Sequence, residues 1–448
     1  MSAAEDPSKP GAGAFEVTHR MVLGLALPMT FGFLTIPLLG ITSTAVAGRL
    51  GDPDILAGLA IGTVIFDLIF STFNFLRAST TALTAQAWGR GDRAEQEAVF
   101  WRAFLLALAL GVAIVILSPL LLWLGLLVMA PGEGAARATR EWFTLRMLSG
   151  PAALANYAIL GFLLGRGQAR MGLLLQTLIN GINIVLCIVF GLWMAGGIAG
   201  IALATIVGET VGALAGLAVI LMSFGHRTPL GIDGLFARPK LMSLFSLNTD
   251  IMVRSFVLLA AFLLMTRIGS SFGPVTLAAN AVLMNFFMVA GFWLDGLANA
   301  AETIIGRSIG ARFRPAFDRG LRLTGYWSLA LALATTILML VFGRPVIDFL
   351  TTSPEVRPVA YQHLPWAAIT AVTGCLAFLM DGVFIGATWS HAMRNRMILA
   401  FIGYVASLAI LVPLGGNAGL WIGLNVFLIL RGLLLALDLP KLRDQIFA

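Results

Sequence analysis

Residues 101–129 read WRAFLLALALGVAIVILSPLLLWLGLLVM, and Arg102 is the one charged residue in this stretch. A bilayer core about 30 Å thick is crossed by about 20 apolar residues in helical form, so the stretch is long enough to span a membrane. Of the 448 residues in the chain, 59% are hydrophobic and 11% are charged, whereas about 25% are charged in soluble domains. With a mean hydropathy of +0.93, this composition indicates an integral membrane protein.

Apolar runs of this kind recur along the whole chain and are separated by short polar or glycine-rich breaks. In lipid every backbone polar group must be paired internally, which helices achieve within one segment. A β-barrel would show shorter segments of alternating hydrophobicity, so the runs predict an all-α membrane protein. The twelve predicted spans are residues 20–48, 55–88, 101–129, 138–164, 171–195, 198–223, 248–270, 276–305, 321–343, 358–387, 395–414 and 417–437.

Lysine and arginine residues gather at alternate ends of the predicted spans. With the N-terminus in the cytoplasm, the cytoplasmic loops and tails hold nineteen of the 29 basic residues, and the opposite side holds six. This bias follows the positive-inside rule and predicts that both termini are cytoplasmic. The net charge of +7 therefore reports orientation in a bilayer, and no nucleic-acid partner is expected.

The longest polar connection follows the sixth span and divides the chain into two halves of six spans. The second span of each half ends in a Gly-Arg pair, Gly89-Arg90 and Gly306-Arg307. Equal topology predicts a parallel repeat, with two lobes related by a pseudo-two-fold axis along the membrane normal. The predicted divisions are a disordered cytoplasmic tail at 1–18, an N-lobe at 19–225, a cytoplasmic linker at 226–247, a C-lobe at 248–437 and a cytoplasmic tail at 438–448.

Polar residues at helical spacing mark the predicted interior. A charged group at mid-bilayer costs at least about 2.5 kcal/mol, so such groups should face a cavity or one another. We predict one continuous polar stripe on the second span and further polar faces on five other spans. The residues are Thr63, Asp67, Ser71, Asn74, Arg77 and Thr81 on the second span, Gln176, Asn180, Asn183 and Cys187 on the fifth, Thr205 and Glu209 on the sixth, Asp250 and Arg254 on the seventh, Asp295, Asn299 and Glu302 on the eighth, and Asp381 on the tenth.

Some of these groups also fit a purely structural role. Asp250 and Arg254 lie one turn apart and predict an ion pair within one helix. Glu209 fits a hydrogen bond to a neighbouring helix as well as it fits a functional site.

The sequence suggests a structural role for one further acid but not for two others. Asp67 with Arg77 fits a half-buried ion pair with access to water. Asp295 and Asp381 have no basic residue within about a turn of sequence. An unpaired carboxyl in a span is neutralised unless the site opens to water, so these two acids are predicted proton carriers.

The first predicted span contains two prolines, Pro28 and Pro37. Each removes a backbone hydrogen bond and favours a kink, which fits either a moving hinge or a fixed bend. Four histidines lie near span ends, and no Ser-His or metal-ligand cluster is visible in the sequence. We therefore expect neither an enzyme nor a metal site.

Several strings resemble the MATE family of multidrug and toxic compound extrusion transporters, and in particular its DinF-like bacterial branch. They cover the chain from residue 20 to the C-terminus. The matching strings are LALP at 25–28, TAVAGRLG at 44–51, FLRASTTALTAQA at 75–87, LAANAVL at 277–283, Leu294-Asp295-Gly296 with Ala300-Ala301-Glu302, and Asp381-Gly382 with Gly386-Ala387-Thr388.

The resemblance implies a monomeric, two-lobed antiporter of the bacterial inner membrane, with a V-shaped central cleft and alternating access. Such transporters export small organic compounds, often lipophilic and cationic or neutral, in exchange for protons or sodium ions. We expect the proton as the coupling ion and no resident cofactor. A lipid-linked precursor flippase of the same superfamily is the alternative, although the acidic span charges fit a cationic or neutral substrate better.

Two positions depart from the family pattern. Ser43 and Cys187 stand where the resemblance implies the two coupling aspartates of the N-lobe, and neither side chain replaces a carboxylate at neutral pH. Coupling is then expected at other acids, or the protein is an uncoupled or inactive homologue. The candidates for ion coupling are Asp67, Glu209, Asp295, Glu302 and Asp381. The candidates for the substrate cavity are Ser43, Asn74, Arg77, Gln176, Asn180, Asn183, Cys187, Thr205, Asp250, Arg254, Asn280 and Asn299, and the hinge candidates are Pro28 and Pro37.

Overall fold

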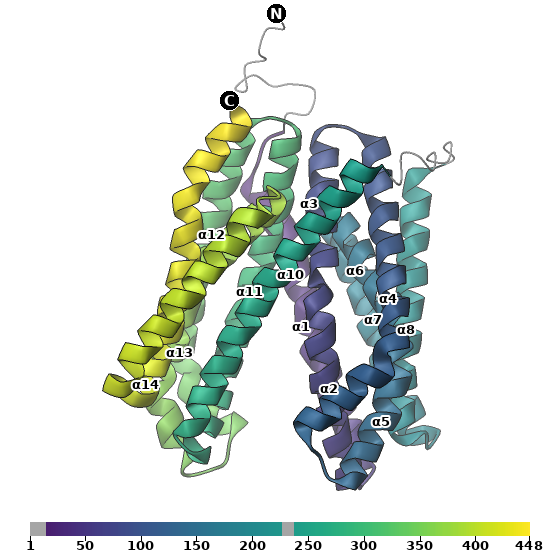
Figure 1. The fold of residues 1–448 in the computed structure, drawn as a ribbon, viewed down its shortest axis with the longest axis vertical. Helices are drawn as coiled ribbons and strands as arrows, with labels where there is room; N and C mark the ends of the chain where they lie inside the picture. The colour runs from purple at the N-terminus through teal and green to yellow at the C-terminus, as the bar shows by residue number, and fades with distance from the viewer. Residues whose placement is uncertain (1–14, 226–236) are drawn as a thin grey trace, which may run out of the picture. The chain divides into compact units, whose positions relative to one another are not determined.

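A computed structural model describes residues 15–225 and 237–448, and all of its regular elements are helical (Figure 1). Most of the predicted N-terminal tail and the first half of the predicted linker lie outside the described residues. The first half of the chain forms α1 (His19–Arg49), α2 (Pro53–Ser71), η1 (Thr72–Asn74), α3 (Phe75–Gly89), α4 (Arg93–Met129), α5 (Glu133–Met147), α6 (Gly150–Gly165), α7 (Ala169–Ile188), the π-helical η2 (Val189–Trp193) and α8 (Gly197–Phe224). The second half forms α10 (Arg238–Ser271), α11 (Pro274–Gly310), α12 (Arg314–Leu350), α13 (Val356–Gly386) and α14 (Ser390–Phe447).

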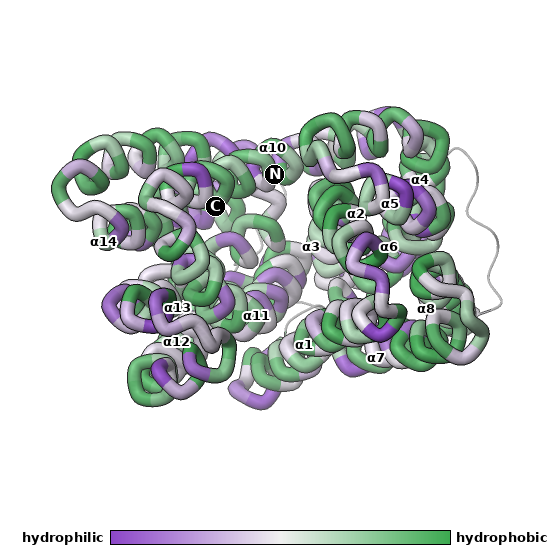
Figure 2. The backbone as a smooth tube through the Cα atoms, turned by 90° about the horizontal axis from the view of Figure 1, so that it is seen from below, coloured by the Kyte–Doolittle hydropathy of each residue, from purple (hydrophilic) through white to green (hydrophobic). Residues whose placement is uncertain are grey.

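Twelve membrane spans account for these helices. Ten described helices, counting α2 with α3 and α7 with η2, are long and apolar enough to cross a membrane, and the bent pair α5 and α6 makes an eleventh span. The twelfth arises because α14 is two helices joined at Gly416, whose φ of 54° and ψ of −129° are not helical. A straight helix of 58 residues would be about 87 Å long, far more than a bilayer requires. Figure 2 shows hydrophobic stretches on all labelled helices.

Two predicted boundaries differ from the structure. Helix α10 begins at Arg238, so the second half of the predicted linker is helical. Helix α14 continues to Phe447, so the predicted C-terminal tail is helical as well. Both segments carry charged residues, which lower the hydropathy on which a span prediction depends without preventing helix formation.

The chain forms two compact units. The N-terminal unit contains Phe31–Ala87 and Asp92–Leu244. The C-terminal unit contains Phe245–Ala448 together with residues 15–30 and Trp88–Gly91 from the first half of the sequence. Helix α1 is continuous through both of its prolines, and the boundary between the units falls between them, at Thr30 and Phe31.

Each half of the sequence has the same turn at the ends of its second and fourth spans. A residue with positive φ follows the helix, and two backbone hydrogen bonds of the Schellman type close the turn. In the N-terminal half these residues are Gly91 and Gly167. In the second half they are Arg312 and Thr388, each 221 positions further along the chain.

Close helix packing repeats with the same offset. Four glycines lie against a neighbouring helix so closely that a Cβ would collide with its backbone carbonyl oxygen. The contacts pair Gly161 with Arg77, Gly165 with Thr81, Gly382 with Ala298, and Gly386 with Glu302, again 221 positions apart between the halves. The fourth span therefore packs on the second as the tenth packs on the eighth, which supports the predicted internal repeat.

Candidate functional site

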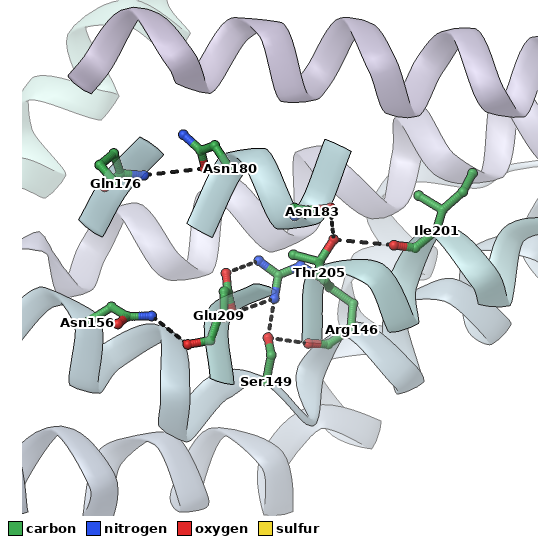
Figure 3. Close-up of polar contacts among 9 residues, drawn as sticks. All are labelled: Arg146, Ser149, Asn156, Gln176, Asn180, Asn183, Ile201, Thr205 and Glu209. Carbon is green, nitrogen blue, oxygen red and sulfur yellow. Dashed lines mark hydrogen bonds and ion pairs between the residues drawn. The ribbon is translucent and has the colours of Figure 1, made fainter. Parts of the chain in front are cut away.

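A buried ion pair joins α5 to α8 in the N-terminal unit (Figure 3). The guanidinium of Arg146 donates to both carboxylate oxygens of Glu209, at 2.8 and 3.1 Å. Arg146 also contacts Ser149 and lies 3.8 Å from the centre of the Phe66 ring. Their side chains are only 9% and 14% exposed, so each charge is balanced chiefly by the other. Glu209 thus pairs with an arginine that the sequence prediction did not single out, although Arg146 was visible as a cation inside a span.

Asn156 completes the surroundings of Glu209. Its Nδ2 donates to the backbone carbonyl of Glu209 at 3.0 Å, which ties α6 to α8 beside the ion pair. Tyr157, the next residue, is within electrostatic reach of Glu209, Arg146 and Asp67. Aromatic and charged groups from α2, α5, α6 and α8 therefore converge on one region of the N-terminal unit.

Asp67 of α2 is the acid in this region that lacks an ion-pair partner among the described residues. Its side chain is exposed, and it lies within electrostatic reach of Arg146. Arg77, with which the sequence paired it, donates from Nε to Asn74 Oδ1 at 3.0 Å, and the pair with Asp67 stays a prediction. The helix that carries the expected continuous stripe on the second span is not regular. The 3-10 segment η1 interrupts it and changes the rotation per residue between α2 and α3.

The polar residues of α7 contact α1 and α8. Asn180 Nδ2 donates to Thr35 Oγ1 at 2.5 Å, and Gln176 Nε2 donates to Asn180 Oδ1 at 3.4 Å. One turn further, Thr205 Oγ1 of α8 donates to Asn183 Oδ1 at 3.2 Å. Figure 3 shows the α7 amides and Thr205 near the Arg146–Glu209 pair. The face predicted from helical spacing is thus shared between three helices.

Ser43 and Cys187 lie side by side at the end of this polar face. Cys187 Sγ is 4.0 Å from Ser43 Oγ, and Cys187 is fully buried. The two positions at which the family resemblance implies aspartates are therefore adjacent in space. Carboxylates at both positions would lie close enough to share a proton.

A second charged cluster lies in the C-terminal unit and involves three helices. Asp381 Oδ2 of α13 accepts from Arg431 of α14 at 2.5 Å and also from Arg254 of α10. All three side chains are at most 14% exposed. The interpretation of Asp381 as a carboxyl without basic neighbours is therefore wrong, because packing brings two arginines to it from distant parts of the sequence.

The predicted Asp250–Arg254 pair is also replaced by other contacts. Asp250 accepts from Ser390 Oγ at 2.8 Å and from Arg394 Nη1 at 2.6 Å, and its carboxylate lies 3.0 Å from His391 Nδ1. The side chain of Asp250 is 2% exposed. This cluster joins the first half of α10 to the beginning of α14, so Asp250 has a role in packing.

The remaining candidates lie on α11. Asn299 Nδ2 donates to the backbone carbonyl of Asp295 at 2.7 Å, and Glu302 is 2% exposed. Asn280 exchanges two hydrogen bonds with Asn417, at 2.7 and 2.9 Å, and accepts a third from Trp421 Nε1 at 2.9 Å. These amides lie beside the break at Gly416, so Asn280 fastens the last span to α11.

Comparisons with known proteins agree with this architecture. The MatE family model matches the chain twice, at residues 28–189 and 251–412. The DNA damage-inducible protein F of Escherichia coli is 38% identical over 424 residues, which cover 92% of this chain and 90% of that protein. A probable multidrug resistance protein NorM of Neisseria meningitidis is 24% identical over 376 residues and 80% of each chain.

Solved structures share the fold over almost the full length. A MOP superfamily transporter from Pyrococcus furiosus has a TM-score of 0.85 at 19% identity and covers 96% of each chain. A multidrug resistance MATE family transporter in an outward-facing conformation has a TM-score of 0.85 at 18% identity, with 96% of each chain covered. Twelve membrane spans in the described residues, an internal repeat and matches across both halves lead to one conclusion: the chain is a multi-pass membrane protein that belongs to the MATE family of transporters.

Proposed function

We propose that this protein is a proton-coupled antiporter that exports small organic compounds by alternating access. Relatives named as probable multidrug resistance proteins support the substrate class, and buried polar groups inside the spans support an aqueous or ion-binding interior. The bias of basic residues supports a place in the bacterial inner membrane with both termini in the cytoplasm.

The observation that carries the proposal is the arrangement of Asp67, Arg146 and Glu209. Arg146 pairs with Glu209 and lies 3.8 Å from the ring centre of Phe66, the residue directly before Asp67, so Asp67 is the second acid beside the same guanidinium. These three groups come from α2, α5 and α8, and α5 packs against both other helices. The site therefore holds one cation and two acids. Its charges balance when one of the acids binds a proton, so the site can exchange one proton.

Proton exchange at Asp67 would change how the three helices are held together. When Asp67 is ionised, its carboxylate competes with Glu209 for Arg146. When Asp67 binds a proton, its charge is lost and Arg146 is held by Glu209 alone. A proton taken up on one side and released on the other can thus be linked to helix movement, while substrate moves in the opposite direction.

Substrate is proposed to use the polar face of α7, where Asn180 and Asn183 contact α1 and α8. These amides and hydroxyls carry no charge, and they suit neutral or weakly polar parts of an organic compound. The acids of the coupling site would attract a cationic group. The C-terminal candidates Asp295 and Glu302 are proposed as secondary acids, whereas Asp381 is assigned to structure because two arginines hold it.

The test is transport in proteoliposomes with an imposed pH gradient and ethidium as the organic cation. Asp67→Asn should abolish acceleration of ethidium transport by the gradient. Ethidium exchange at equal pH should remain within about threefold of the unchanged protein. Asp54→Asn is the matched control because it makes the same change at the beginning of the same helix.

Three results would count against the proposal. Full proton-driven transport by Asp67→Asn would remove Asp67 from coupling. Acceleration by a sodium gradient alone would replace the proton with sodium. Indifference to both gradients would favour an uncoupled transporter, which the Ser43 and Cys187 substitutions also fit.

A further inference from the structure

An apolar pocket lies between α11 and α12 of the C-terminal unit, whereas the polar site described above belongs to the N-terminal unit. Its volume is about 690 Å³, within the range of pockets that hold drug-sized ligands. One face of α12 and the first half of α11 form its walls. The lining includes Asn285, Phe286 and Trp293 of α11 and Ala334, Met339 and Phe342 of α12.

The walls of this pocket combine aromatic rings with flexible apolar side chains. Phe286, Trp293 and Phe342 supply ring faces that attract organic cations, and Met339 can repack around ligands of different shape. No lysine, arginine, aspartate or glutamate is among the lining residues. The pocket can therefore attract a cation through its aromatic rings, although its walls carry no charged side chain.

Asn285 supplies one polar group in these apolar surroundings. Its Nδ2 donates to the carbonyl oxygens of Ala281 and Val282 within the same helix, at 3.0 and 3.3 Å. Its side chain is exposed, and its Oδ1 accepts no hydrogen bond from the described residues. Asn285 is the twelfth residue of α11, about 17 Å from the beginning of the helix, so its amide lies well inside the predicted eighth span. The free oxygen is thus an acceptor for a ligand that carries an N–H.

We propose that this pocket binds lipophilic ammonium compounds that reach it from the bilayer. The ring faces and Met339 would hold the apolar body, and Asn285 Oδ1 would accept a hydrogen bond from the ammonium group. A lipid acyl chain would fill the apolar walls but would leave the amide oxygen unpaired. This inference extends the proposed function by adding a binding site for its substrates.

The experiment measures binding to purified full-length protein in detergent, by equilibrium dialysis and without any gradient. Two probes are compared: the protonated form of N,N-dimethyl-3,3-diphenylpropylamine, which has one N–H, and tetraphenylphosphonium, which has none. Ala334→Trp fills the pocket and should weaken the binding of both probes at least about tenfold. Leu333→Trp is the matched control, because its side chain is exposed on the same helix and lies outside the lining.

The second variant isolates the amide. Asn285→Leu should weaken binding of the ammonium probe about tenfold, the size expected for one lost hydrogen bond to a charged group. It should leave tetraphenylphosphonium binding within about twofold. Equal loss of both probes would show that the amide does not recognise the N–H.

Other outcomes separate this site from the transport mechanism. Unchanged binding in Ala334→Trp would overturn the proposal and place the probes elsewhere. Displacement by phosphatidylcholine at equal potency would make the pocket a lipid site and would overturn it as well. The assay needs no gradient, so its result does not depend on proton coupling. Loss of binding in Ala334→Trp, together with the expected selectivity of Asn285→Leu, would support this binding site even if the protein proved not to be proton-coupled.

Discussion

Arg254 donates to Asp381 on α13, although Asp250 lies only one turn before it on the same helix. Asp381 also accepts from Arg431 of α14. The C-terminal unit thus joins its fourth span to its sixth by an aspartate and an arginine. The N-terminal unit makes the corresponding link with reversed polarity, since its arginine lies on the fourth span and its glutamate on the sixth.

Replacement of Asp381 by Asn should strongly reduce the stability of the protein. A residue used only in transport would not have this effect. Two buried guanidinium groups would lose their shared carboxylate, and loss of one partner from a buried pair costs about 3 to 5 kcal/mol. Thermal unfolding in detergent measures this effect, with Asp348→Asn as an exposed acid for comparison. A stable Asp381→Asn protein that had lost only proton-driven transport would instead make Asp381 a coupling residue.

Aspartates at positions 43 and 187 should restore a shared proton site. Ser43 Oγ and Cys187 Sγ are 4.0 Å apart, so two carboxylates there would repel each other unless one is protonated. We expect ethidium transport by the double variant Ser43→Asp with Cys187→Asp to depend more steeply on pH than in the unchanged protein. Ser43→Asn with Cys187→Asn controls for polarity and size. The same pH profile in both double variants would contradict the prediction.

Gly382→Ala should destabilise the C-terminal unit. A Cβ at this position would collide with the backbone carbonyl of Ala298, and backbone cannot move aside as a flexible side chain can. Thermal unfolding should show a loss of at least about 2 kcal/mol, the scale of overpacking in a rigid interior. Gly374→Ala on the same helix is the control, because a Cβ there meets Phe378 and Leu428 at ordinary contact distances of 3.5 and 3.6 Å. Equal stability of the two variants would show that α11 and α13 pack less tightly than described.

The repeated turns predict opposite effects of glycine in the two halves. Gly167→Ala should cost about 1 kcal/mol because its φ of 70° suits glycine better than other residues. Arg312→Gly, at φ 49°, should be neutral or stabilising by up to about 1 kcal/mol for the same reason. Gly181→Ala serves as the helical control, since it has open space around it and should gain about 0.5 to 1 kcal/mol. Chemical or thermal unfolding of the three purified variants measures these changes, and destabilisation by Arg312→Gly would refute the argument.

The sequence determined the number and type of the spans. Apolar runs of about 20 residues require helices in lipid, and Gly-Arg pairs at equivalent places indicated two halves of the same topology. Helical spacing also grouped Asn180 and Asn183 on one face of α7, which contacts α1 and α8. These properties depend on residues close together in sequence, so a single chain reveals them.

Only the tertiary structure decided which charged groups meet. Sequence spacing paired Asp250 with Arg254, but in the folded structure Asp250 forms an ion pair with Arg394, and Arg254 forms one with Asp381. In the N-terminal unit, helix packing brings Glu209 against Arg146, which lies 63 positions away in the sequence. The physical reason is that a buried charge is stabilised by whatever opposite charge helix packing brings near it, and packing is set by close contacts between helices far apart in the chain. The sequence thus identified the buried charges of this transporter, and the fold determined the partner of each one.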